Sequence, residues 1–110
     1  MGLPYVQTIV AAAPAGAQAP YAADWMQSPF DCTWSLEGLG STTGTYSIEY
    51  TMDDVNAVAS PTWTQIVPAN QTINRQGQIT FPVMFLRVNF SVGPVGGNCT
   101  FVVLQGMSAR

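Results

Sequence analysis

Apolar and polar residues alternate along most of the chain from residue 30 onward. In residues 30–37 every even position is apolar and every odd position is polar. This two-residue period is typical of a strand with one buried face. Residues 46–52 repeat the alternation, and residues 62–67 form a third such run after Pro61. These three segments predict strands that share one core.

The last third of the chain contains two β-rich runs, residues 83–91 and 99–105, separated by a Gly/Pro-rich loop. Apolar residues fill every even position from Met84 to Phe90, and they also occupy the odd positions Val83 and Phe85. We therefore expect one face of the first run to lie in the core and part of the other to be covered. The two runs together predict a hairpin that closes the domain.

The complete set of expected strands indicates an all-β fold. Short strands are expected at residues 72–74 and 78–80, with Arg75, Gln76 and Gly77 between them. The chain then holds six or seven strands at a spacing of about 10–15 residues, which is typical of a β-sandwich or jelly roll. We expect residues 29–110 to form this single domain.

Residues 1–28 differ in composition from the rest. They are rich in Ala, Pro and Gly, and prolines at three of the first 20 positions disfavour a long helix. We expect an extended arm, with a short strand allowed at residues 5–10. Several of its side chains are poorly suited to a solvated tail, so the arm should dock on its own domain or on a neighbouring subunit. These side chains are Tyr5, Tyr21, Trp25 and Met26.

The amino-acid composition limits the classes of binding partner that the chain can have. Only 8% of the 110 residues are charged, whereas 47% are hydrophobic, and such a low charge does little to oppose self-association. This favours burial in an assembly, with a Thr/Ser-rich monomer as the alternative. The net charge is −3 and three scattered arginines form no basic patch, so we expect no nucleic acid and no membrane as partner. No apolar run reaches the roughly 20 residues of a membrane span.

The residues needed for common catalytic mechanisms are scarce. Histidine and lysine are absent, which removes most proton-shuttling and Schiff-base chemistry. Cys32 and Cys99 have no histidine that would activate a thiolate. Their strand starts would lie at opposite ends of neighbouring antiparallel strands, so we expect two buried free thiols, with a disulfide as the alternative. We expect no enzyme activity, no metal and no cofactor.

A few polar and aromatic groups are candidates for binding or catalytic sites. Asp53, Asp54 and Asn56 offer oxygens to calcium but are too few to fill its coordination sphere, so a polar turn is expected. Glu37 and Glu49 should both point outward from the polar faces of their strands and not act as a glycosidase pair. Trp63 is in phase with polar residues, and its exposure would suit a sugar-binding platform.

The order of the strands resembles that of small β-sandwich virion proteins of tailed bacteriophages. The resemblance covers about residues 30–106 and is one of pattern, carried by the segments Trp34-Ser35-Leu36-Glu37-Gly38, Gly44-Thr45-Tyr46-Ser47-Ile48-Glu49-Tyr50-Thr51, Thr62-Trp63-Thr64, Phe81-Pro82-Val83-Met84-Phe85-Leu86-Arg87-Val88-Asn89 and Thr100-Phe101-Val102-Val103-Leu104-Gln105-Gly106. It is closest to the proteins that decorate or cement capsids. A tail, baseplate or fibre module and a carbohydrate-binding module remain the alternatives.

The resemblance implies a mechanical role. A capsid decoration protein of this type, made in the host cytoplasm, would sit on the capsid surface of the virion, bind between subunits of the major capsid protein and stabilise the phage head. It would form a homo-oligomer, with a trimer favoured. The candidate interface residues are Tyr5, Tyr21, Trp25, Met26 and Trp63, because aromatic side chains are enriched at binding hot spots. Deleting residues 2–28 should then abolish capsid binding and keep the fold.

Overall fold

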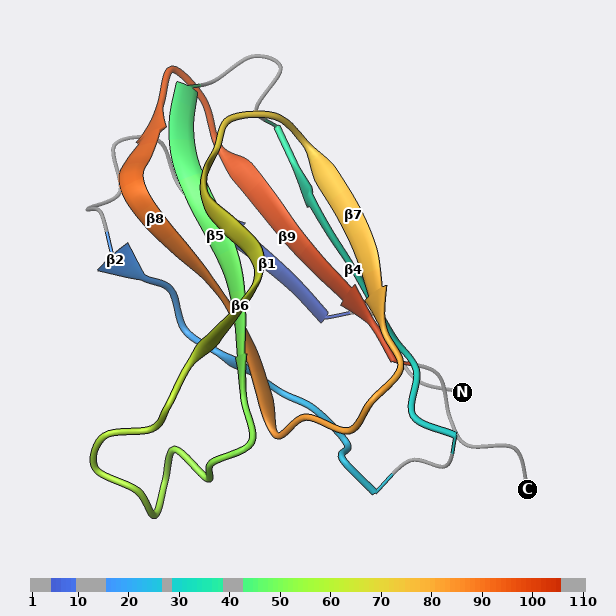
Figure 1. Cartoon of the computed structure of the whole chain (residues 1–110). Helices are drawn as coiled ribbons and strands as arrows, with labels where there is room; N and C mark the ends of the chain where they lie inside the picture. Colours follow the sequence, from blue (N-terminus) through green and yellow to red (C-terminus); the bar gives the residue numbers. More distant parts are fainter. Residues whose placement is uncertain (1–4, 10–15, 27–28, 39–42, 106–110) are drawn as a thin grey trace.

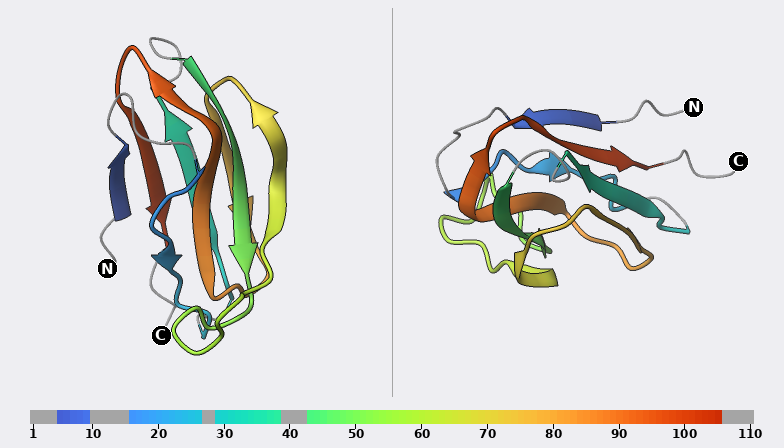
Figure 2. Two further views of the ribbon diagram at one scale, coloured as in Figure 1. Left: turned by 90° about the vertical axis from the view of Figure 1, so that its left-hand side faces the viewer. Right: turned by 90° about the horizontal axis from the view of Figure 1, so that it is seen from above.

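A computed structural model describes residues 5–9, 16–26, 29–38 and 43–105 of the protein. All regular elements in these ranges are strands, and they form two antiparallel sheets that pack face to face (Figures 1 and 2). The all-β sandwich predicted from the alternating pattern is therefore confirmed.

The first sheet contains four strands in the order β1-β9-β4-β7. Their bounds are Tyr5–Ile9 for β1, Cys99–Leu104 for β9, Cys32–Glu37 for β4 and Arg75–Ile79 for β7. The alternation seen in the sequence of β4 becomes an alternation of burial, since Cys32, Trp34 and Leu36 are buried whereas Thr33 and Glu37 are exposed.

The second sheet has the order β2-β8-β5-β6, and β3 also pairs with β8. The bounds are Gly16–Ala17 for β2, Tyr21–Ala22 for β3, Thr43–Thr51 for β5, Thr64–Gln71 for β6 and Phe85–Val95 for β8. Side chains from β5 and β8, among them Tyr46, Ile48, Leu86, Val88 and Phe90, meet those of the first sheet in one core.

The predicted closing hairpin is wrong. β8 and β9 follow one another in the chain, but β8 pairs with β5 whereas β9 pairs with β1 and β4, so the connection crosses from one sheet to the other. Gly96, at φ 94°, lies in this connection. A positive φ suits glycine, and here it accompanies a change of sheet. Both strands are rich in apolar residues because each is an inner strand of its own sheet.

The break expected at residues 75–77 is also misplaced. Arg75, Gln76 and Gly77 belong to β7, and residues 72–74 form the turn that precedes it. Gly77 pairs with Trp34, and a Cβ at Gly77 would lie only 2.8 Å from an indole carbon. The glycine therefore makes room for the indole ring inside the sheet and does not mark a turn.

The described residues of the expected arm are part of the sandwich. β1 joins the first sheet beside β9, whereas β2 and β3 join the second sheet beside β8 (Figure 1). The rings of Tyr5 and Tyr21 lie 5.1 Å apart, and Ile9 and Ala23 enter the core. Because the N-terminal residues complete both sheets and part of the core, deleting residues 2–28 is expected to destabilise the fold, in contrast to the expectation from sequence.

Candidate functional site

Three chain segments meet at the end of the sandwich where β5 ends and β8 begins (Figure 1). The backbone of Met84 links them, because its carbonyl accepts a hydrogen bond from the amide of Ala23 and its amide donates one to the carbonyl of Thr51, each 2.9 Å long. Backbone hydrogen bonds fix relative positions without depending on side-chain rotamers. The three segments therefore form a defined surface.

This surface contains a hollow of about 270 Å³, lined by Trp25, Met52, Pro82, Val83 and Met84. We call it the end hollow. Val83 is only 1% exposed, whereas Met52 is 60% exposed and Trp25 is 50% exposed. A residue of the core thus underlies the hollow, and two large apolar side chains stand in solvent beside it.

Exposed apolar side chains are concentrated at this end of the sandwich. Nine large hydrophobic residues are exposed in the described part of the chain, and five of them belong to the connections at this end of the sandwich: Trp25, Met26, Met52, Val58 and Phe81. The ring of Phe81 packs edge-on against Tyr50 with centroids 5.2 Å apart. Scattered exposed apolar residues are ordinary on protein surfaces, whereas a group of them marks an interaction surface.

The charges beside the hollow are negative. Asp24 directly precedes Trp25, and Asp53 and Asp54 directly follow Met52. Of the arginines that the structure describes, Arg75 begins β7 at the opposite end of the sandwich, and Arg87 is paired with Glu49. The end hollow therefore combines apolar side chains with an excess of carboxylates.

The carboxylates after β5 also shape the loop, as the predicted polar turn requires. Asp53 Oδ2 accepts a 2.7 Å hydrogen bond from the amide of Thr62, and Asp54 Oδ1 accepts one of 2.9 Å from the amide of Asn56. No group of three or more potential metal-ligating side chains gathers within the described ranges. These aspartates are placed by backbone amides of their own loop.

A second feature, the polar cluster, lies on the outer face of the second sheet. Glu49 and Arg87 are cross-strand partners, and Arg87 Nε donates a 2.8 Å hydrogen bond to Glu49 Oε1. Asn89 Nδ2 donates to Glu49 Oε2 at 3.2 Å, and Ser47 lies 3.4 Å from the same oxygen. Glu49 is only 6% exposed. It points outward from its strand as predicted, and the side chains of Arg87, Asn89 and Ser47 cover it.

Trp63 belongs to the polar cluster. The guanidinium carbon of Arg87 lies 3.8 Å from the centroid of its ring, which is the geometry of a cation–π contact. Trp63 is half-buried. Since Arg87 occupies one face of the indole, a sugar ring has at most the other face for stacking.

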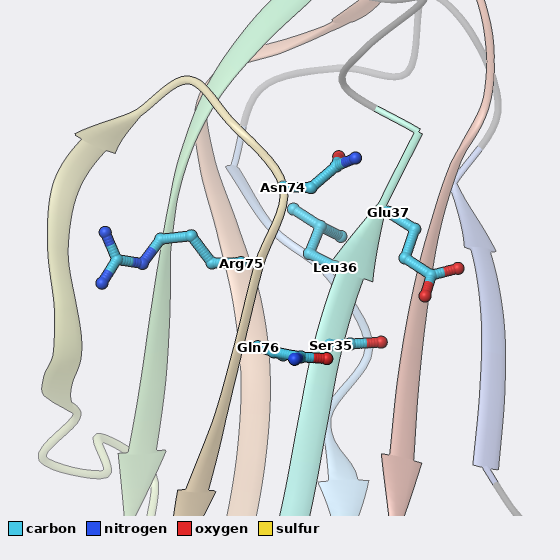
Figure 3. A pocket seen from close by; sticks show the side chains of 6 residues that line it. All are labelled: Ser35, Leu36, Glu37, Asn74, Arg75 and Gln76. Carbon is cyan, nitrogen blue, oxygen red and sulfur yellow. The ribbon is translucent and has the colours of Figure 1, made fainter.

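The larger hollow of the two is polar and lies at the opposite end of the sandwich. It measures about 450 Å³ and is lined by Ser35, Leu36, Glu37, Asn74, Arg75 and Gln76. Its two charged side chains, Glu37 and Arg75, extend in opposite directions (Figure 3). Arg75 Nη1 donates to Gln71 Oε1 at 3.1 Å. With no charged groups converging on one point, this hollow is a weaker candidate site.

The two cysteines are free and buried, as expected. Burial raises the pKa of Cys32 to about 12, with a further contribution from Asp31, and burial also raises the pKa of Cys99. The register of β4 and β9 places them six residues apart along the ladder, or about 20 Å. Neither nucleophilic reactivity nor a disulfide is compatible with this arrangement.

The candidate interface residues lie in three different places. Tyr5 and Tyr21 pack against each other at one edge of the sandwich, and the Tyr21 hydroxyl donates a 2.9 Å hydrogen bond to Gln105 Oε1. Trp25 and Met26 are exposed near the end hollow, and Trp63 lies in the polar cluster. Sequence reasoning missed Met52, Phe81 and Met84 as surface residues, because the apolar phase of the adjoining strands assigned Met52 and Met84 to the core.

Comparison with models of known protein families, with curated proteins and with solved structures finds no match for this chain. The described part of the chain also holds no helix of the length and apolarity needed to cross a membrane.

Proposed function

We propose that this protein is a non-enzymatic structural component of a bacteriophage virion, namely a capsid decoration protein that binds between major capsid protein subunits and stabilises the head. The observation that carries the proposal is the end hollow with its exposed apolar surroundings. A stable protein that keeps Trp25, Met26 and Met52 in solvent has a surface suited to a partner.

The remainder of the molecule supports a binding role. The low charge of the chain suits close packing in an assembly, and the sequence resembles small virion sandwiches. The carboxylates of Asp53 and Asp54 are engaged in the loop after β5, that of Glu49 is engaged in the polar cluster, and the thiols are buried. The function assigned to the protein is thus to occupy a position on the capsid surface, as a homo-oligomer with a trimer favoured.

Binding to phage heads tests this function. Heads from a deletion mutant of the phage that encodes the chain would be incubated with purified protein, pelleted through sucrose and analysed for bound copies per head. We expect saturable binding and a higher temperature of DNA release from the heads. Binding to isolated tails and not to heads would favour a tail or baseplate module, and binding to neither would contradict the proposal.

The oligomeric state is a separate test. Light scattering coupled to size exclusion should give three times the 11.8 kDa mass of the chain. A monomer at all accessible concentrations would remove self-assembly from the proposal and leave capsid binding to be judged by the sedimentation experiment alone.

A further inference from the structure

The end hollow is small for a ligand-binding site. Its volume of about 270 Å³ lies below the range of roughly 300–1,000 Å³ in which drug-sized ligands bind. The two backbone hydrogen bonds of Met84 hold its lining segments together before any partner arrives. A preformed hollow of this kind lowers the ordering cost of binding.

The carboxylates at this end argue against a second copy of the chain as the occupant. If two copies met through their end hollows, Asp24, Asp53 and Asp54 of each would face the same residues of the other. Like charges brought together across an interface oppose association, and at physiological salt charges within about 8 Å are incompletely screened. Pairing of two end hollows in a two-fold dimer is therefore disfavoured, and the same carboxylates favour a partner segment that carries basic residues.

We propose that the end hollow binds a segment of a partner protein in which one aliphatic or aromatic side chain is flanked by lysine or arginine. The apolar side chain enters between Trp25 and Met52 above Val83, and the basic residues lie over Asp24, Asp53 and Asp54. This inference rests on the proposed function, under which the segment belongs to the major capsid protein. The basic residues accelerate encounter and set orientation, whereas the apolar side chain supplies most of the affinity.

Three synthetic pentapeptides test the chemistry without requiring phage heads. The probe is acetyl-Lys-Lys-Leu-Lys-Lys-amide, compared with peptides in which serine replaces leucine or glutamate replaces every lysine. Binding is followed by NMR at the indole N–H of Trp25 and the methyl groups of Met52 and Met84. We expect the leucine peptide to shift these three signals, and both altered peptides to bind about tenfold more weakly.

Matched variants assign the effect to the end hollow. Trp25→Ser with Met52→Ser removes two of the reporters, and the remaining Met84 methyl signal should no longer respond to the peptide. Ile73→Ser, which alters a residue 62% exposed in the turn before β7, should preserve the response of all three signals. Replacing Asp24, Asp53 and Asp54 by asparagine keeps side-chain oxygens for the loop amides and should remove the preference for lysine over glutamate. Glu37→Gln at the opposite end is the charge control.

The outcomes separate this inference from the proposed function. Equal responses to the three peptides, or shifts that avoid the three reporter signals, would overturn the inference whatever the protein does on heads. Binding to heads that survives Trp25→Ser with Met52→Ser would leave the decoration role intact and move its interface elsewhere. If the peptides bind as expected but the protein does not bind heads, the proposed ligand chemistry of the end hollow stands. The capsid is then rejected as the source of the bound segment.

Discussion

The polar cluster and the end hollow differ in the solvent exposure of their side chains: the first buries polar groups, and the second exposes apolar ones. On the outer face of the second sheet the polar residues Ser47, Glu49 and Thr51 are at most 6% exposed, whereas at the end of the sandwich Trp25 and Met52 are at least 50% exposed. The buried polar groups are stabilised by partners within the fold, but the exposed apolar groups have no comparable cover. Strand phase predicts which way a side chain points, and its neighbours decide whether it meets water.

The largest effect is expected from breaking the ion pair of the polar cluster. Arg87→Met leaves the Glu49 carboxylate covered without its strongest hydrogen-bond donor, and should lower the free energy of unfolding by about 3 kcal/mol, the lower end of the range for buried pairs. The measurement is urea unfolding monitored by tryptophan fluorescence.

Removing both charges is the control for that variant. Glu49→Leu combined with Arg87→Met leaves no unpaired charge, and should recover stability to within about 1 kcal/mol of the wild type. If Arg87→Met alone lowered the free energy of unfolding by less than about 1 kcal/mol, the pair would behave as an ordinary surface salt bridge. The distinction between a stabilising buried polar cluster and the exposed end hollow would then be rejected.

Trp63→Ala should have the next largest effect. It removes a half-buried ring and its contact with the Arg87 guanidinium, at a cost of about 2 kcal/mol in unfolding free energy. Trp63→Phe keeps an aromatic face and should cost less than half of that. In the Arg87→Met background, Trp63→Ala should lower the free energy of unfolding by about 0.5–1 kcal/mol less than it does in the wild type. An equal loss in both backgrounds would show that the cation–π contact does not stabilise the fold.

Alkaline pH should lower the stability of the protein through buried groups of the core that titrate there. The polar cluster contains no thiol or phenol and should not contribute to this loss. The pKa of Cys32 is raised by burial from 9.0 to about 12, so between these values the unfolded chain releases a proton that the folded chain keeps. This thiol's contribution to stability is therefore complete below pH 9 and is lost as the pH rises towards 12, at about 1.4 kcal/mol per pH unit.

The raised pKa values of Tyr21 and Tyr46, caused mainly by burial, act in the same direction at higher pH. Urea midpoints at pH 8, 9, 10 and 11 measure the effect, with a loss of about 1 kcal/mol expected from Cys32 between pH 9 and 10. Cys32→Ala should flatten the profile. A wild-type midpoint constant from pH 8 to 11 would contradict the assigned cause.

The smallest effect on stability is expected at the end hollow. Trp25→Ser and Met52→Ser remove exposed side chains, and each should change the free energy of unfolding by no more than about 0.5 kcal/mol. Val83→Ala, in the buried residue beneath the hollow, should cost about 2 kcal/mol in the same assay. If Trp25→Ser were as costly as Val83→Ala, Trp25 would be part of the core and its availability to a partner would be rejected.

The sequence was most informative where one strand face meets the core. The alternation in residues 30–37 correctly predicted β4, and the even positions Leu86, Val88 and Phe90 are buried in β8 as expected. The pairing of β8 with β5 could not be read from the same pattern, because two apolar strands that follow one another satisfy the pattern whether they pair with each other or separate into two sheets.

The candidate site was predictable only in part. Trp25 and Met26 are predictable as surface candidates because they suit a solvated tail poorly, and both lie exposed near the end hollow. Met52 and Met84 are not predictable in this way. Each continues the apolar phase of a strand, and whether such a residue is exposed depends on where the strand ends. The outward direction of Glu49 was predictable from its strand phase, but its burial was not, because the covering residues Arg87 and Asn89 belong to a strand distant in sequence.

The pairing of β1 with β9 has a consequence for the order in which the molecule assembles. Tyr5 pairs with Val103, so the first described strand finds its neighbour 98 residues later in the chain, since 103 minus 5 is 98. During synthesis β1 has no partner until β9 has left the ribosome, and the edge of β8 that receives β2 and β3 also forms late. Contacts of such long range make folding slow. The sandwich is therefore completed only after β9 has been made, and until then the core residue Ile9 of β1 lacks its cover, which favours aggregation.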